Sequence, residues 1–180
     1  MPTVSRAESR AARVARDGVL AAAALLCSYL ETLLPVGQLL SLPGFRVGLA
    51  NVIVTFVLFE LSAWDAAGIA AVKTLLSAVL FGGPVSFAFS AAGTALSFAG
   101  LLLVRLLAHD RLSYVGICII GAALHNCGQI CVAILLFDSG VAAYLPVLLI
   151  ASAVFGGVCG GVVCFAAPGL RRAVGRRGAA

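Results

Sequence analysis

One apolar run limits the fold of this chain more than any other stretch. It extends from Tyr114 to Phe137, contains no charged residue, and is long enough to cross the roughly 30 Å hydrocarbon core of a bilayer as a helix. Near its centre the run carries His125, Asn126 and Gln129. At 100° per residue, Gln129 lies about 40° and Asn126 about 100° from His125, so all three occupy one sector of a helix. The run therefore predicts a membrane helix with a polar face that does not look at lipid.

Composition extends this prediction to the rest of the chain. The 180 residues are 62% hydrophobic and 11% charged, with a mean hydropathy of +1.14, far above the roughly 45–50% apolar content of a soluble domain. The pattern predicts an all-α integral membrane bundle at residues 18–166, between basic tails at residues 1–17 and 167–180. The first tail is interpreted as a frayed segment that sets the orientation, with a basic helix on anionic lipid as the alternative. The six expected transmembrane helices cover about residues 18–34, 49–63, 66–80, 86–107, 114–137 and 142–166.

The expected helices differ in length and in packing signals. The segments 49–63 and 66–80 would each rise only about 22 Å, which predicts a pair that sits shallow or re-enters the membrane. Pro35 and Pro168 are expected to end the first and last helices. The last helix contains two overlapping Gly-x-x-x-Gly pairs, Gly156 with Gly160 and Gly157 with Gly161, which let a neighbouring helix approach closely.

The distribution of Lys and Arg predicts the orientation. Four Arg lie in residues 1–17, two lie at residues 105–111, and four lie in residues 167–180. The connections on the other side of the membrane contain only Arg46. The positive-inside rule therefore predicts a multi-pass protein with both termini in the cytoplasm.

Motifs for catalysis are missing from the sequence. The seven acidic residues are scattered and form no carboxylate cluster that could hold Mg²⁺ against a diphosphate. No Gly-x-x-x-x-Gly-Lys-Ser/Thr loop is present, and His125 has no nearby nucleophile. The six Cys lie in apolar runs without Cys-x-x-Cys spacing and are interpreted as small hydrophobic residues. We therefore expect that the protein is not an enzyme and binds no metal or other cofactor. We also expect no nucleic acid partner, because the basic tails account for the net charge of +5.

Polar residues within the apolar segments are the candidates for a binding site. A Lys at the bilayer centre costs about 2.5–3.5 kcal/mol, so Lys73 is expected to face protein, water or a ligand. Two structural alternatives remain open: Lys73 pairs with Glu31 or a backbone carbonyl, and His125 makes only a helix-to-helix hydrogen bond. The grouping of polar residues favours a pocket that opens to the outer side. The expected substrate-binding residues are Lys73, His125, Asn126, Gln129, Asn51, Glu31 and Arg46.

Several stretches, in this order, together resemble one family. They are Ser28-Tyr29-Leu30-Glu31, Leu34-Pro35, Pro43-Gly44, Gly48-Leu49-Ala50-Asn51, Phe81-Gly82-Gly83, Gly121 to Gln129, and Tyr144-Leu145-Pro146. They resemble the Gx transporter family, which is also labelled heptaprenyl diphosphate synthase component I, over about residues 18–166. A departure is Lys at position 73, where the family pattern would have Arg, which keeps the charge but loses bidentate recognition.

The resemblance implies the fold of the substrate-binding S components of energy-coupling factor (ECF) transporters. It implies a bacterial plasma membrane protein that captures a small, vitamin-like or anionic solute near the outer face. The implied partners are a transmembrane scaffold subunit and ATPase subunits. The scaffold would contact small residues of the first helix, here Gly18 with Ala22 and Ala24 with Ser28.

The second family label leaves another function open. Under that label the chain would be a non-catalytic membrane component of a prenyl (heptaprenyl) diphosphate synthase or of a quinone-linked complex. The sequence alone does not decide between this function and solute capture.

Overall fold

The computed structural model describes residues 10–33, 48–108 and 112–173, and the described chain is helical without a strand. It contains six α-helices, close to the six expected segments, together with a π-helical turn η1 (Ala78–Gly82) and a 3₁₀ turn η2 (Ser139–Tyr144). The α-helices are α1 (Arg10–Leu33), α3 (Asn51–Glu60), α4 (Ala63–Ser77), α5 (Gly83–Ala108), α6 (Tyr114–Leu136) and α7 (Leu145–Ala173).

Local signals explain several helix boundaries. The Ser62 hydroxyl accepts a hydrogen bond from the Trp64 backbone N–H at 3.2 Å and caps α4, and the Ser113 hydroxyl caps α6 by accepting from Gly116 at 3.3 Å. Between α4 and α5 the chain turns at Gly83, whose φ of +69° favours glycine. The turn expected at Phe81 to Pro84 is therefore confirmed as a change of direction, although the helical hydrogen bonding continues through it.

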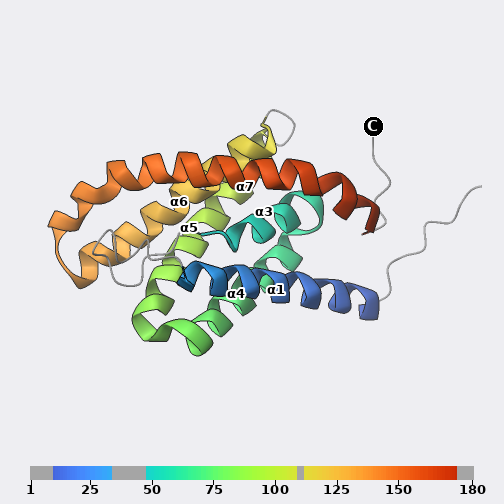
Figure 1. Cartoon of the computed structure of the whole chain (residues 1–180), viewed down its shortest axis with the longest axis horizontal. Helices are drawn as coiled ribbons and strands as arrows, with labels where there is room; N and C mark the ends of the chain where they lie inside the picture. The colour runs from blue at the N-terminus through green and yellow to red at the C-terminus, as the bar shows by residue number, and fades with distance from the viewer. Residues whose placement is uncertain (1–9, 34–47, 109–111, 174–180) are drawn as a thin grey trace, which may run out of the picture.

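The short helix α3 lies in the middle of the bundle, between α1 and α7 (Figure 1). Seven of its ten residues are buried, and Val54 to Phe59 form an unbroken buried run. The hydrophobic core around it takes residues from all six α-helices. In Figure 1 the start of α1, the connection from α3 to α4 and the end of α7 lie at the same end of the molecule.

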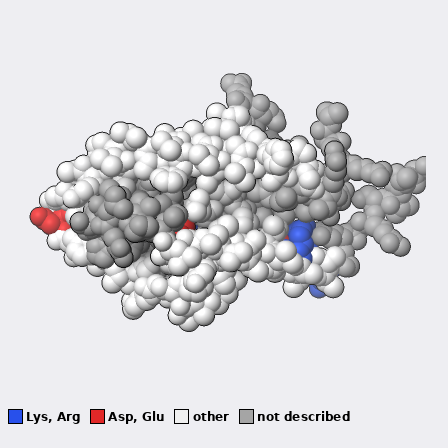
Figure 2. All heavy atoms as spheres, in the orientation of Figure 1, with Lys and Arg blue, Asp and Glu red and all other residues white. Residues whose placement is uncertain are grey.

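Three helical stretches of the described chain are long and apolar enough to cross a membrane, as judged by length and composition. They are Ala63–Ala108, Tyr114–Leu136 and Ser139–Gly169. The first comprises α4, η1 and α5, and so folds back on itself at Gly83. Helix α3 is apolar but shorter, in agreement with the expectation of a short second segment. Among the described residues, the face shown in Figure 2 has little charge between its two ends, as expected for a lipid-facing surface.

Glycines bring α6 into close contact with both neighbours. A Cβ atom on Gly160 of α7 would lie 2.5 Å from Val115 Cα of α6, and one on Gly156 would lie 2.8 Å from Ile119 Cα. On the other side, a Cβ on Gly128 of α6 would lie 2.6 Å from the Ala92 carbonyl oxygen of α5. The pair Gly156 and Gly160 therefore confirms the expected close helix approach.

Two expected helix ends are wrong. The first helix begins at Arg10 instead of Gly18, because the Ala- and Arg-rich segment before Gly18 has high helix propensity and continues the same helix. The last helix continues through Pro168 to Ala173. Proline lacks one N–H but keeps a helical φ, so near a helix end it removes one hydrogen bond without stopping the helix.

Candidate functional site

Four polar side chains from three helices form a continuous buried hydrogen-bond chain. Lys73 Nζ of α4 donates to Asn51 Oδ1 of α3 at 2.9 Å. The Asn51 amide nitrogen lies 2.7 Å from His125 Nδ1 of α6, and His125 Nε2 lies 2.7 Å from Gln129 Nε2, one turn further along α6. The exposed fractions are 3% for Lys73, 8% for Asn51, and 1% for both His125 and Gln129. Below, these four residues are called the polar chain.

The direction of the hydrogen bonds fixes the proton on His125. Lys73 can only donate, so Asn51 accepts through its oxygen and turns its amide nitrogen toward the imidazole. Nδ1 of His125 is then an acceptor, and the neutral ring carries its proton on Nε2. That proton needs an acceptor at Gln129. The structure has the amide nitrogen of Gln129 at this position. We assign the amide oxygen to it instead, because two donors cannot bond to each other and the hydrogen-bond network decides between the two ends of an amide.

This tautomer gives a spectroscopic prediction. In ¹⁵N NMR spectra of protein labelled at histidine, His125 is expected to show an unprotonated Nδ1 and a protonated Nε2 at neutral pH. In Asn51→Asp the carboxylate accepts from Lys73 but offers no N–H, so the proton is expected to move to Nδ1. Spectra of His125→Gln would identify the signals, since His109 is the other histidine. A protonated Nδ1 in the unsubstituted protein would contradict the assigned chain.

Two glycines fit closely around the His125 ring. Gly48 has a φ of +89° and begins the turn in which its carbonyl accepts from Asn51 N–H at 2.9 Å. A Cβ on Gly48 would lie 3.3 Å from His125 Cδ2, and one on Gly93 of α5 would lie 2.7 Å from His125 Cε1. Gly93 was not among the residues expected at the site. Its sequence signal is the helical spacing of small residues along α5, all of them buried: Ser86, Ser90, Gly93 and Ser97.

The other expected site residues lie apart from the polar chain or outside the described residues. Asn126 turns to α7, where its amide nitrogen donates to Leu148 O at 3.1 Å and to the Ser152 hydroxyl at 2.7 Å. Glu31 accepts from the Leu49 backbone N–H at 2.6 Å and so joins α1 to the start of α3. Arg46 lies outside the residues that the structure describes.

The small residues of α1 lie on two different faces. Ala24 and Ser28 are buried within this chain, with exposed fractions of 0% and 1%, whereas Gly18 and Ala22 are exposed. Of the two expected pairs, Gly18 with Ala22 is the one that a partner helix can reach. The burial of Ala24 follows from its contact with the core around α3.

Two cavities border the described helices. One lies beside Asn51 between α3, α6 and α7, with a volume of about 20 Å³, which is room for about one water molecule. Gly121 and Gly156 line it, together with Cys118 and Cys159. The other is an apolar groove of about 420 Å³ between α4 and α5, lined by Ala67, Ala70, Ala71, Thr74, Leu75, Phe87, Ala91, Thr94, Ala95 and Phe98. In the described part of the chain, no three His, Cys, Asp or Glu side chains come together as a metal-ligand set.

Comparison with known protein families identifies the family of this chain. Residues 20–165, which include the whole polar chain, match the family described as heptaprenyl diphosphate synthase component I. The chain belongs to the heptaprenyl diphosphate synthase component I family. Membership in the component I family confirms the family indicated by the sequence motifs. No curated protein and no solved structure matches this component I chain.

Proposed function

We propose that the protein is a substrate-binding membrane subunit that captures a small solute from the outer side. The observation that carries the proposal is the polar chain, in which a lysine and three other polar side chains converge from α3, α4 and α6 inside an apolar bundle. Intramembrane ionisable residues are expensive and usually mark ligand or ion sites. Of the other expected residues, Glu31 and Asn126 bond elsewhere and Arg46 lies outside the described residues, so the proposal rests on the polar chain.

The chemistry of the polar chain indicates the class of solute. Its four side chains hold more N–H donors than acceptors, and lysine donates only. A ligand that binds here is therefore rich in hydrogen-bond acceptors, with a carboxylate or phosphate as its charged group. Lys73 recognises such a group as a point charge and not through the planar fork of an arginine.

The proposed setting is an ECF-type uptake transporter in the bacterial plasma membrane. The six-helix subunit has both termini in the cytoplasm and has no catalytic role of its own. The exposed pair Gly18 and Ala22 on α1 is the proposed contact for a transmembrane scaffold subunit, which associates with the ATPase subunits. These partners supply the energy for delivery of the solute.

Ligand retention and uptake test the proposal together. Native mass spectrometry of the purified protein is expected to show a retained acidic small molecule. Lys73→Met is expected to lower affinity for that molecule about 10- to 100-fold, because a hydrogen bond to a charged group contributes about 1.5–3 kcal/mol. Lys73→Arg should retain part of the affinity. Thr55→Val, which removes a buried hydroxyl on α3 outside the polar chain, is the matched control. If Lys73→Met left the uptake of every acidic solute unchanged, the proposal would be ruled out.

The family description favours a second candidate function, a membrane component of a heptaprenyl diphosphate synthase. The apolar groove between α4 and α5 supports this candidate, since a polyprenyl chain is apolar. The two candidates differ in their partners. Recovery of a soluble prenyl diphosphate synthase with the tagged protein, without ATPase subunits, would favour the second candidate. Recovery of ATPase subunits would favour the first.

A further inference from the structure

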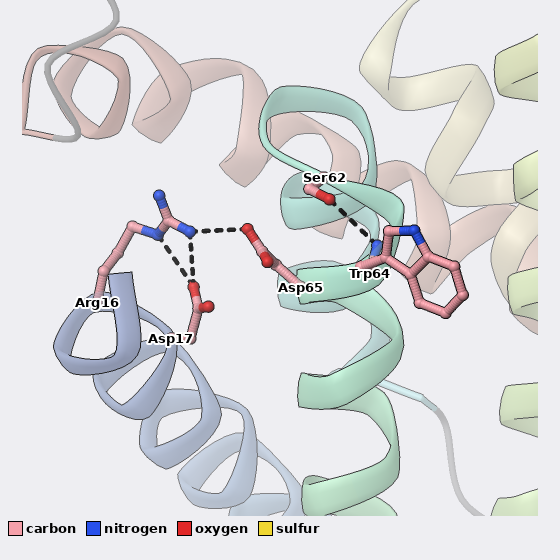
Figure 3. A network of polar contacts seen from close by, with 5 residues as sticks. All are labelled: Arg16, Asp17, Ser62, Trp64 and Asp65. Atoms are coloured by element: carbon pink, nitrogen blue, oxygen red, sulfur yellow. Dashed lines mark hydrogen bonds and ion pairs between the residues drawn. The ribbon is translucent and has the colours of Figure 1, made fainter. Parts of the chain in front are cut away.

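Trp64 occupies an unusual position for a large aromatic side chain. It is the only tryptophan of the chain, stands in the first turn of α4, and is 87% exposed. Figure 3 shows its indole ring pointing away from α1. Tryptophan is enriched at membrane–water interfaces, because its ring is apolar and its N–H is polar.

Charged side chains lie at the same end of the molecule. Arg16 of α1 forms an ion pair with Asp65 of α4 at 2.8 Å and with its neighbour Asp17 at 2.9 Å (Figure 3). Arg10 and Arg13 lie one to two helical turns beyond Arg16 and are exposed. Further along α4 the exposed side chains are apolar, as Val72 and Leu75 illustrate. Charge therefore gives way to an apolar surface close to Trp64.

We propose that this end of the molecule is seated in the lipid headgroup layer, with Trp64 as its interfacial anchor. The partner is the phospholipid surface itself. The exposed cations Arg10 and Arg13 complement anionic headgroups, which attract basic residues close to the membrane surface. The indole of Trp64 occupies the boundary between headgroups and hydrocarbon.

The anchor sets the depth of the polar chain. Lys73 lies nine residues beyond Trp64 in α4, and Asn51 lies nine residues before the end of α3 at Glu60. At 1.5 Å per residue, each polar side chain is at most about 14 Å from the boundary, near the middle of a hydrocarbon core about 30 Å thick. The buried apolar run of α3 fills the bundle between the polar chain and this boundary. The polar chain is therefore closed toward the Trp64 side, whatever its ligand is, and this inference does not depend on the proposed function.

Intrinsic fluorescence tests the proposal, because Trp64 is the single tryptophan. The full chain is reconstituted into vesicles of phosphatidylcholine and phosphatidylglycerol, and brominated phosphatidylcholines serve as quenchers. Bromine atoms close to the headgroup are expected to quench Trp64 about twofold more than bromine atoms near the end of the acyl chain. Stronger quenching by the deep bromines would overturn the proposal, as would stronger quenching by aqueous iodide than by the shallow bromines.

A second variant provides an internal depth reference. The double variant Trp64→Phe/Leu75→Trp has its tryptophan eleven residues further along α4, a distance of about 16 Å at 1.5 Å per residue. The side chain of Leu75, which it replaces, is 56% exposed. The ratio of shallow to deep quenching is expected to reverse in this variant. Equal ratios for the two proteins would overturn the proposal. If the double variant does not fold, the ratio measured for Trp64 in the unsubstituted chain still decides.

Discussion

Gly160→Ala is expected to lower the free energy of unfolding by about 1–3 kcal/mol, the usual effect of forcing an extra methyl group into a tightly packed contact. The new Cβ would lie 2.5 Å from Val115 Cα and 3.0 Å from the Tyr114 carbonyl oxygen. Both are backbone atoms of α6, so α6 and α7 must move apart and lose the contacts between them. The change in stability is measured by heating the protein in detergent and recording how much of it remains monodisperse at each temperature.

The adjacent glycine provides the matched control. A Cβ on Gly161 would meet nothing within 4 Å, so Gly161→Ala makes the same chemical change on the same helix without a collision. It is expected to leave stability unchanged or to raise it slightly, because alanine favours the helix by up to about 1 kcal/mol over glycine. Equal destabilisation by both substitutions would show that the α6 to α7 contact is not as close as the structure has it.

Asn51→Leu is expected to destabilise the protein and to abolish ligand binding. Asn51 is the only link between Lys73 and His125 in the polar chain, and both neighbours are buried. A buried hydrogen bond contributes about 0.5–1.5 kcal/mol, or about 1.5–3 kcal/mol when one group is charged, and this substitution removes one bond of each kind. Unfolding in detergent measures the stability, and mass spectrometry measures the retained ligand.

Thr55→Val separates the polar chain from general effects of changing α3. Thr55 lies one turn after Asn51, is 3% exposed, and lines the small cavity. Its replacement by valine keeps the shape of the side chain and removes one uncharged hydroxyl, so it is expected to change stability by about 1 kcal/mol or less. A loss of stability as large as that of Asn51→Leu would mean that the polar chain contributes no more than ordinary helix packing.

The sequence predicted the helices well, because apolar length and Gly or Pro punctuation are local properties. All six expected segments contain an α-helix in the described chain. The boundaries at Gly18 and Pro168 were missed for a shared reason. The segment before Gly18 is rich in alanine and arginine, which favour helix, so α1 includes it. Pro168 lies near the end of α7, where a proline is tolerated, so α7 passes through it. Composition alone therefore marks no helix end at either place.

The candidate site was predicted in part. The 40° between His125 and Gln129 keeps them together, and they share a hydrogen bond. The 100° between His125 and Asn126 is wide enough to face a different helix, and Asn126 lies against α7. The bond from Lys73 to Asn51, two residues on different helices, depends on the packing of α3 against α4.

The unequal attachment of the helices to α6 has a mechanical consequence. Helices α5 and α7 meet α6 backbone against backbone at Gly128, Gly156 and Gly160, with no flexible side chain between them that could yield. On its third side α6 meets α3 through the hydrogen bond between His125 and Asn51, and α4 is bonded in turn to α3 through Lys73. We therefore expect α5, α6 and α7 to move as one unit, and any rearrangement of the bundle to displace α3 and α4 relative to that unit.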